Sequence, residues 1–155
     1  MRHGPVGEMG PAEEEMKITL KEDVHPDNDF YYYQQFKIYQ EPYLLWDRET
    51  WKGVLSACTV YRIEVDGKVA GDVILEESRK DILSIVDIGL LPEYQGRGIG
   101  KEVLQKVRKM GKKLSAVTRK ETLPFFLKSG FVLKKKIEDY YDLGVDGYSI
   151  TFDGK

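Results

Sequence analysis

The chain has 155 residues, the length of one ordinary domain, and its hydrophobic share of 41% argues against a disordered chain and a coiled coil. Its 24 basic and 26 acidic residues give a net charge of −2, which argues against a general nucleic-acid binder and a cationic membrane-surface protein. A single cysteine, Cys58, and two histidines without ligand spacing exclude an internal disulfide and a Cys-rich zinc site, and they predict a reducing, cytoplasmic location.

The first half of the chain predicts a tail, a strand and two helices. Residues 1–15 are rich in glycine and proline and contain no apolar run, so we expect a flexible N-terminal tail before one domain over residues 16–155. A short apolar strand is predicted over 17–20. Asp27-Asn28-Asp29 supplies N-cap chemistry for a helix that runs to about Tyr39, and Asp47 is placed to cap a second helix that runs to about Leu55.

The second half predicts a sheet. Residues 59–65 alternate with period two, and Asp66-Gly67 is a strong hairpin signal with a returning strand expected over 68–75. The nearly continuous apolar run 82–91 is typical of a buried central strand. Further elements are expected as a helix from Ile99 that ends near Gly111, strands at 113–118, 131–137 and 147–152, and a short helix at 122–129. The fold class is therefore α/β: a mixed, mostly antiparallel central sheet of about seven strands with about four helices.

A glycine cluster follows the predicted central strand and opens the predicted helix. Glycine stands at every second position of residues 96–100, which lets the backbone approach an anion at a helix N-terminus. The dinucleotide fingerprint fails because Lys101 stands at its last glycine, and the Walker motif fails because Gln95 and Glu102 replace its glycine and its Ser or Thr. The cluster thus predicts a different pyrophosphate cradle, and a glycine-rich turn without a ligand is the alternative.

The segment Gln95-Gly96-Arg97-Gly98-Ile99-Gly100 resembles the coenzyme A motif of the GCN5-related N-acetyltransferase (GNAT) superfamily, [Gln/Arg]-x-x-Gly-x-[Gly/Ala]. Residues 87–94 look like the fourth strand of that family, and residues 124–131 resemble its helix-four signature. Tyr140-Tyr141 with residues 147–150 is similar to the closing hairpin of the ribosomal-protein and N-terminal acetyltransferase branch. The resemblance implies the GNAT fold and an acyltransferase that moves the acetyl group of acetyl-CoA to a primary amine of a small molecule, a protein N-terminus or a lysine.

The resemblance also implies how coenzyme A is held. Its pantetheine arm is expected to pair with the central strand like an added strand, while its pyrophosphate lies on the backbone N–H groups of the glycine cluster. The expected cofactor-binding residues are Ile88, Gly89, Leu90, Gln95, Gly96, Arg97, Gly98, Ile99, Gly100, Lys101, Arg119, Phe126 and Lys128. Arg119 stands where many members carry asparagine, so a contact with a phosphate and a solvated surface charge both remain open.

The implied reaction is a direct attack of the amine on the thioester. The backbone amide of Leu90 or Leu91 is expected to stabilise the oxyanion. Because an alkylammonium has a pKa of about 10, a base or a water chain must first remove a proton. Asp87 is the candidate base, since a carboxylate on so apolar a strand needs a reason, and a structural hydrogen bond is the alternative.

One departure from the family pattern concerns the proton donor. The tyrosine that usually protonates the leaving thiolate is replaced by Phe126, which can pack against pantetheine but carries no proton to give. Another tyrosine or water therefore serves, or the thiolate leaves unassisted, or the chain is a non-catalytic module that binds acyl-CoA. Cys58 is expected to be a small buried thiol, because no histidine partner is in evidence and the family needs no covalent intermediate.

The acceptor side is expected among the aromatic residues that crowd into residues 30–51. Helical spacing predicts that Tyr32, Phe36 and Tyr39 face the core. The remaining candidates for acceptor contacts or replacement proton donors are Tyr31, Tyr33, Tyr43 and Trp46.

The charge is unevenly distributed along the chain. Residues 96–136 hold thirteen basic and two acidic residues, a net charge of +11, which leaves −13 for the rest. This asymmetry fits a polyanionic cofactor on one side and a cationic amine on the other. The expected partners are thus acetyl-CoA and a small-molecule amine or protein N-terminus, with a homodimer as one assembly and with no metal, nucleic acid or membrane.

Overall fold

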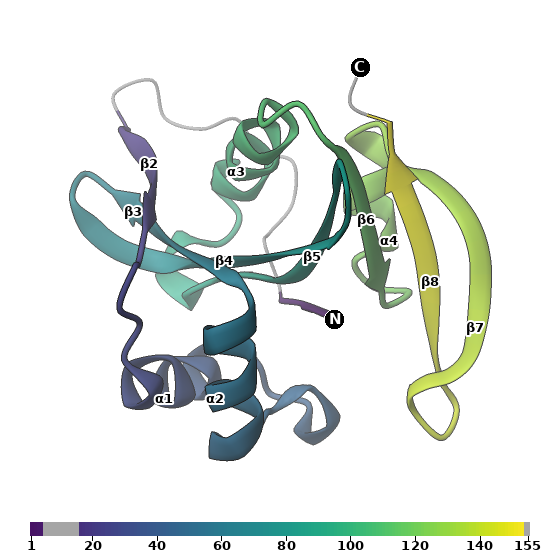
Figure 1. Cartoon of the computed structure of the whole chain (residues 1–155), viewed down its shortest axis with the longest axis horizontal. Coiled ribbons are helices and arrows are strands. Elements are labelled where there is room, and N and C mark those ends of the chain that lie inside the picture. Colours follow the sequence, from purple (N-terminus) through teal and green to yellow (C-terminus); the bar gives the residue numbers. More distant parts are fainter. Residues whose placement is uncertain (5–15, 154–155) are drawn as a thin grey trace.

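The computed structural model describes residues 1–4 and 16–153, in which one twisted sheet carries helices on both faces (Figure 1). The strands are β1 (Arg2–His3), β2 (Ile18–Glu22), β3 (Thr59–Val65), β4 (Lys68–Arg79), β5 (Ile82–Leu90), β6 (Lys113–Thr118), β7 (Val132–Asp142) and β8 (Val145–Phe152). The helices are α1 (Asn28–Ile38), α2 (Arg48–Ala57), α3 (Ile99–Arg108) and α4 (Leu123–Lys128), with short 3-10 turns η1 (Pro42–Leu44) and η2 (Pro92–Tyr94). The expected fold class, a mixed and mostly antiparallel sheet with helices, is confirmed.

The sheet contains one gap that matters for function. Its strand order is β2-β3-β4-β5-β6-β8-β7, and all neighbours in that order are antiparallel except β5 and β6. These two parallel strands pair only where Ile82–Ser84 faces Lys113–Ser115, and beyond that point they separate (Figure 1). We call the space between their separated ends the splay.

Local sequence explains most of the elements. Asp27 caps α1 by accepting a hydrogen bond from the Asp29 amide (3.1 Å), and Asp47 caps α2 by accepting one from the Thr50 amide (2.8 Å). The hairpin between β3 and β4 turns through Asp66 and Gly67, which both have positive φ as a tight hairpin turn requires. β4, β7 and β8 are longer than expected, because pairing continues into polar residues that an apolar pattern does not mark.

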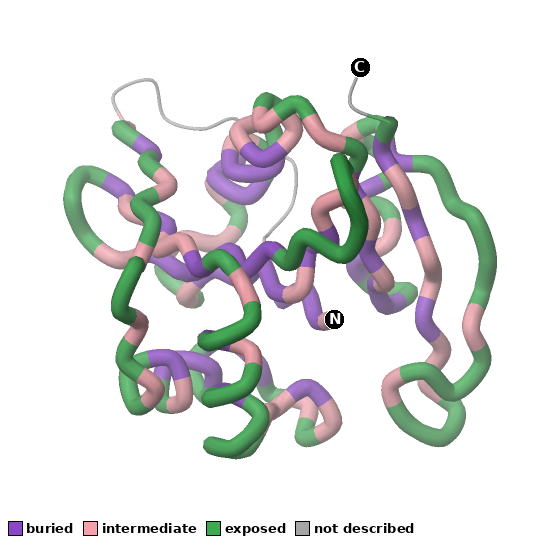
Figure 2. The backbone as a smooth tube through the Cα atoms, in the orientation of Figure 1, coloured by how far each residue is buried: buried purple, intermediate pink, exposed green. Residues whose placement is uncertain are grey.

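Buried apolar side chains among the described residues form three clusters. The larger core packs α3 and α4 against the sheet and includes Ile85, Ile88, Leu90, Val103 and Phe126. The smaller core lies beneath α1 and α2, on the other face, and a third cluster lies beside it at the end of α1: Tyr31, Trp51, Leu55, Val60 and Ile74 form the former, and Ile38, Tyr39 and Leu44 the latter. Buried positions accordingly run along the central strands, while β7 is largely exposed (Figure 2).

The predicted inward face of α1 is wrong. Tyr31, Gln34, Gln35 and Ile38 are the buried residues of this helix, whereas the Phe36 side chain remains 48% exposed. Hydrogen bonds account for the difference, because both inward glutamines bind partners from other parts of the chain. Tyr39 is buried as expected, although it lies at the C-cap and not within the helix.

The first residues of the expected flexible tail form a strand. β1 pairs in parallel with β5, placing Arg2 opposite Asp87 and His3 opposite Ile88, and the Gly4 amide donates to the Ile88 carbonyl (2.8 Å). Arg2 and His3 are buried because this edge of β5 offers backbone partners and a carboxylate. Residues 5–15 lie outside the described residues, so the tail stays a prediction there.

β1 passes through a narrow place as it leaves the sheet. A Cβ atom on Gly4 would lie 2.8 Å from Ile38 Cγ2, and one on Gly89 of β5 would lie 2.9 Å from the same atom. The Tyr39 side chain closes the same passage, 3.1 Å from that Gly4 position and 3.2 Å from that Gly89 position. Glycine at both positions is therefore needed for the two strands to pass beneath the end of α1.

Candidate functional site

The edge of β5 that faces the splay presents backbone groups at every second residue. The Ile88 carbonyl accepts from Gly4, and the Leu90 carbonyl accepts from the Gln95 side chain (2.9 Å). Because peptide groups alternate along a strand, the Leu90 amide lies on this edge too. The Leu91 amide instead donates to the Ala70 carbonyl (2.8 Å), so it is not free to stabilise an oxyanion and only Leu90 keeps that expected role.

The glycine cluster forms the approach to α3. Gly96 and Gly98 have φ of +74° and +78°, a left-handed conformation that glycine adopts without strain. Gly98 is the N-cap of α3 and has no side chain with which to accept a hydrogen bond from the first-turn N–H groups. Those N–H groups, at the positive end of the helix dipole, are suited to an anion such as a pyrophosphate.

A basic hollow lies between α3 and α4. It has a volume of about 180 Å³ and is lined by Lys101, Leu104, Gln105, Arg108, Lys128 and Ser129. Two residues expected to bind the cofactor, Lys101 and Lys128, are therefore brought together beside the glycine cluster. Three cations around one hollow suit a further phosphate group.

Arg119, the other basic residue expected to reach a phosphate, lies elsewhere. It is buried, its Nη1 lies 3.5 Å from the Glu41 carboxylate, and its Nη2 donates to the His3 carbonyl (3.4 Å). Arg119 is thus neither a surface charge nor part of the basic hollow. It connects the end of β6 to β1, because the His3 carbonyl has no strand partner on this side among the described residues and accepts from the Arg119 side chain instead.

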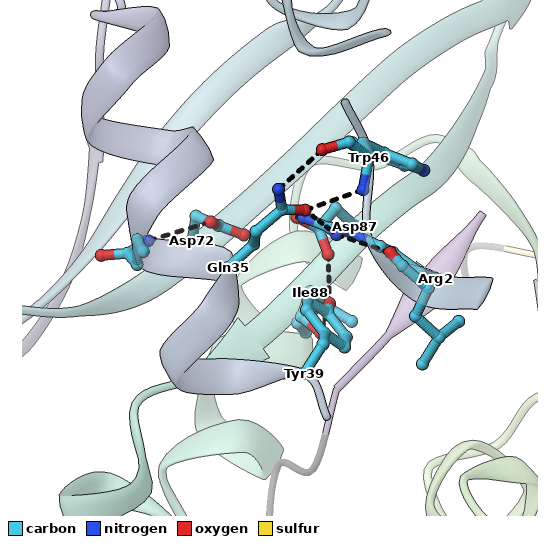
Figure 3. A network of polar contacts seen from close by, with 9 residues as sticks. Arg2, Gln35, Tyr39, Trp46, Asp72, Asp87 and Ile88 are labelled. Atoms are coloured by element: carbon cyan, nitrogen blue, oxygen red, sulfur yellow. Dashed lines mark hydrogen bonds and ion pairs between the residues drawn. The ribbon is translucent and has the colours of Figure 1, made fainter. Parts of the chain in front are cut away.

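A second site lies where the Arg2 side chain enters the smaller core (Figure 3). Its Nη1 donates to Gln35 Oε1 (2.7 Å) and to the Leu44 carbonyl (2.8 Å), and its Nη2 donates to Asp87 Oδ2 (3.2 Å). Three aromatic rings surround the guanidinium carbon, with centroids at 4.2, 4.0 and 4.8 Å, in cation–π contact. We call this site, formed by Gln35, Tyr39, Leu44, Trp46, Trp51 and Asp87, the guanidinium pocket.

Two buried carboxyl groups, Asp87 and Asp72, lie on the neighbouring strands β5 and β4 in this region. Asp87 is fully buried and accepts a hydrogen bond from the Tyr39 hydroxyl as well as from Arg2. Asp72, on the neighbouring strand β4, accepts from Gln34 (3.0 Å), but its Oδ1 has no hydrogen-bond partner among the described residues. Burial, reinforced by the nearby charge of Asp87, raises the pKa of Asp72 well above its ordinary value. Burial also raises the pKa of Tyr39, so its hydroxyl keeps its proton.

His3 points to the opposite face of the sheet. Its ring packs against Phe126 (4.8 Å between centroids), and its Nε2 lies 3.1 Å from the Ile85 carbonyl. Burial lowers the pKa of His3 to about 3, so the ring is neutral near pH 7 and Nε2–H is the donor. Phe126 is fully buried between His3 and the Phe131 ring, at the place where β1 and α4 meet.

The four aromatic residues expected on the acceptor side have different fates. Tyr31 is fully buried and its hydroxyl donates to Asp23 (2.7 Å), so it is not an acceptor contact. Tyr33 is 57% exposed and borders a cavity of about 410 Å³ between α1 and the ends of β4 and β5, lined also by Val69 and Leu91. Trp46 belongs to the guanidinium pocket, and the Tyr43 ring lies 6.3 Å from that of Tyr141, near the splay.

Sequence reasoning missed several residues of the site. The Tyr140 hydroxyl lies 3.3 Å from the Met1 amine, and the Tyr141 hydroxyl donates to the Val117 carbonyl of β6 (2.8 Å). The paired tyrosines of the closing hairpin were the signal that could have identified these two. For Arg2 and Gln35 the sequence holds no such signal, because their partners are distant in the chain.

Other expected features have a simpler outcome. Cys58 is half-buried, and burial raises the pKa of its thiol to about 11, as fits an unreactive side chain. In the part of the chain that the structure describes, no group of His, Cys, Asp and Glu could hold a metal ion. Among those same residues no helix is both long and apolar enough to cross a bilayer.

Several solved structures share this fold. The ribosomal-protein-S18-alanine N-acetyltransferase from Escherichia coli superposes with a TM-score of 0.73 at 19% identity, over 88% of this chain and 93% of that chain. A GNAT family acetyltransferase from Elizabethkingia anophelis with acetyl-CoA bound gives 0.70 at 16% identity, over 91% and 99%. A chimeric spermidine N-acetyltransferase from Vibrio cholerae gives 0.72 at 16% identity, over 88% and 95%.

Sequence comparison gives a consistent result at the level of the family. No curated protein matches the chain significantly. The model of the Acetyltransferase (GNAT) family matches residues 20–131, which include the glycine cluster, the β5 edge and α4. Fold, site and family model agree, and the chain belongs to the GNAT family of acetyltransferases.

Proposed function

We propose that this protein is an N-acetyltransferase that transfers the acetyl group of acetyl-CoA to a primary amine. The observation that carries the proposal is the β5 edge, which separates from β6 directly before the glycine cluster at the N-terminus of α3. A strand edge followed along the chain by an anion site suits a cofactor in which an extended amide arm is joined to a pyrophosphate. The arm can pair with the strand edge, and the pyrophosphate can bind at the anion site. The acetyl-CoA bound to a relative of the same fold supports this choice.

The residues of the chain divide the cofactor between them. The backbone N–H groups from Gly96 to Lys101 would hold the pyrophosphate, and the basic hollow would hold a further phosphate. The Ile88 carbonyl on the β5 edge would pair with the amide arm, and the Leu90 amide would donate to the acyl carbonyl. When bound, acetyl-CoA supplies the acetyl thioester that the amine attacks.

This arrangement requires β1 to leave the β5 edge. The Ile88 carbonyl accepts from Gly4 in the described state, and Arg2 and His3 occupy the splay beside it. An occupied edge lowers the apparent affinity for the cofactor by the fraction of molecules in which the edge is free. We therefore propose that residues 1–4 and acetyl-CoA compete for one place.

The acid–base roles follow from burial. Asp87 already pairs with a guanidinium and a tyrosine hydroxyl, which supports a role in holding a cation more than one in removing a proton. Burial lowers the pKa of the Met1 amine beside Tyr140, which supports the transfer of a proton to water by an acceptor amine held in the same surroundings. We propose that Tyr140 donates the proton that the leaving thiolate needs, because Phe126 has no proton to donate. Burial raises the pKa of Tyr140, so its hydroxyl stays protonated and can act as the donor.

Calorimetry with CoA and a thiol-release assay over a panel of amines test the proposal on the full chain. We expect CoA to bind and at least one amine to accelerate thiol release, and no binding at high micromolar CoA would overturn the proposal. Because the Tyr140 hydroxyl also contacts the Met1 amine of docked β1, Tyr140→Phe should bind CoA at least as tightly as the wild type and lose turnover. The second candidate, a non-catalytic acyl-CoA-binding module, is favoured by the buried Phe126 and would show binding without any amine-dependent release.

A further inference from the structure

We propose that the guanidinium pocket is a subsite for the acceptor, and that Arg2 is its internal occupant in the described state. The acceptor would then be a primary amine that also carries a guanidinium group. The assignment of the ligand as the acetyl acceptor rests on the proposed function. The presence of a guanidinium-binding site does not depend on that function.

The pocket matches the shape of a guanidinium group. Three acceptor atoms from three different elements, on Gln35, Leu44 and Asp87, receive hydrogen bonds from its two terminal nitrogens. The surrounding rings of Tyr39, Trp46 and Trp51, from the C-cap of α1, the segment after it and α2, contact its faces. A planar fork can satisfy acceptors in its plane and rings on its faces at once, whereas an alkylammonium presents a single point charge.

The parts of the pocket hold one another in place without Arg2. The Gln35 amide donates to the Trp46 carbonyl (2.7 Å), and the Trp46 amide donates to Gln35 Oε1 (2.9 Å). The Tyr39 hydroxyl holds Asp87. The acceptor atoms are therefore preorganised by the protein and are not arranged by the occupant alone.

An empty pocket would be strongly unfavourable. Asp87 would keep the Tyr39 hydroxyl but lose its counter-charge, with Asp72 buried close by. A buried carboxylate without its partner is costly, so the departure of β1 leaves a site that favours any cation of the right shape. Displacement by the cofactor would thus create the vacancy that the acceptor fills.

The direction of the Arg2 side chain makes joint occupation feasible. The backbone of β1 lies along the β5 edge, and its Arg2 side chain enters the face covered by α1 and α2 (Figure 3). Its His3 side chain enters the opposite face, where it packs against Phe126 of α4. The guanidinium pocket is therefore separate from the edge on which the cofactor arm is proposed to pair. A guanidinium can occupy the pocket while the edge serves another ligand.

The binding test uses the full chain with Arg2→Ala and methylguanidinium as the probe. We expect a saturable rise in the unfolding temperature of this variant at millimolar probe, by several degrees. Wild-type protein, in which Arg2 fills the pocket, should respond much less, and so should Arg2→Ala combined with Asp87→Asn. Methylammonium at the same concentration controls for ionic strength. Equal responses in all three proteins would overturn the proposal.

A second variant protects the test against a failure to fold. Arg2→Gln retains a hydrogen-bond donor near Gln35 and Asp87 but no charge, and it should show the same selective response to methylguanidinium. If Arg2→Ala is unfolded alone, recovery of its circular dichroism spectrum by methylguanidinium and not by methylammonium supports the site. Absence of recovery together with no response of Arg2→Gln refutes it.

An activity test identifies the source of the guanidinium. The thiol-release assay compares an aminoalkylguanidine with the urea of equal length, and a short peptide with arginine at its second residue with the citrulline peptide. Either guanidinium compound should have a KM at least tenfold below its neutral match, and equal KM values in both pairs contradict the acceptor role. Binding of methylguanidinium without binding of CoA would keep the site and refute the enzyme, and the reverse result would refute the site alone.

Discussion

The burial of His3 predicts that acid releases β1 and thereby strengthens CoA binding. In the docked state His3 lies against Phe126 with its Nε2–H on the Ile85 carbonyl, and its Nδ1 has no hydrogen-bond partner among the described residues. Protonation would place a charge at that buried nitrogen. The charged groups nearest to the ring are the Met1 amine and Arg119, which oppose protonation, and Asp87, which favours it less than burial opposes it.

The size of the effect follows from the two pKa values of His3. The docked ring has a pKa of about 3, and the undocked ring has the ordinary value of 6.5. A lowered pKa means that docking is fully stable above 6.5 and weakens as the pH falls toward 3, because only the undocked ring takes up a proton. Between about pH 7.5 and about pH 5.5 the ratio of docked to undocked molecules should fall about tenfold, or about 1.4 kcal/mol.

Calorimetry with CoA at the two pH values measures this change. If β1 and CoA compete, titration of His3 should lower the apparent dissociation constant about tenfold on acidification, relative to a protein without this ring. The phosphate groups of CoA also titrate, and the Met1 amine, whose pKa burial lowers, adds its own pH dependence to docking. The matched control is therefore His3→Leu, which keeps both but has no titrating ring. The reasoning is refuted if both proteins show the same pH dependence, or if acid weakens CoA binding only in the wild type.

Three further predictions concern the same competition. Arg2→Ala removes a charge-assisted contact worth about 2 kcal/mol from the docked state, so calorimetry should show CoA binding about 30-fold more tightly. The surface change Lys112→Ala should leave CoA affinity unchanged. Weaker CoA binding by Arg2→Ala would contradict the role of β1. The only tryptophans, Trp46 and Trp51, both contact Arg2. Titration with CoA should therefore change their fluorescence in the wild type but not in Arg2→Ala. An unchanged wild-type spectrum at saturating CoA would exclude displacement of β1. Lys128→Gln should weaken CoA binding about fivefold at low salt and less at high salt, since an exposed cation is screened, and a salt-independent loss would argue against a phosphate contact.

The elements that were predictable from sequence are those with local causes. Asp27 and Asp47 cap their own helices, Asp66-Gly67 turns its own hairpin, and the apolar run of β5 needs only its own composition. The glycine cluster was predictable for the same reason. A left-handed backbone before a helix favours glycine, so the closely spaced glycines indicate it directly in the sequence.

The parts that were missed depend on contacts between distant residues. A periodic pattern places large apolar side chains inward, but on α1 the inward positions include Gln34 and Gln35, whose partners are Asp72 and Arg2. β1 could not be predicted from the sequence, because two residues in a stretch rich in glycine and proline are too few to show the alternating pattern of a strand. Its position is determined by a carboxylate 85 residues away in the chain, and nothing in the local sequence announces that pairing.

The narrow place beneath the end of α1 also sets a limit on width. Gly4 and Gly89 meet where Ile38 and Tyr39 leave no room for a Cβ atom on either strand. Whatever lies on this edge of β5 must therefore be slender at that height, as a glycine is. The passage therefore selects by width alone: at the height of Gly89 it would admit an unbranched segment of an amide-linked arm and exclude a branched one.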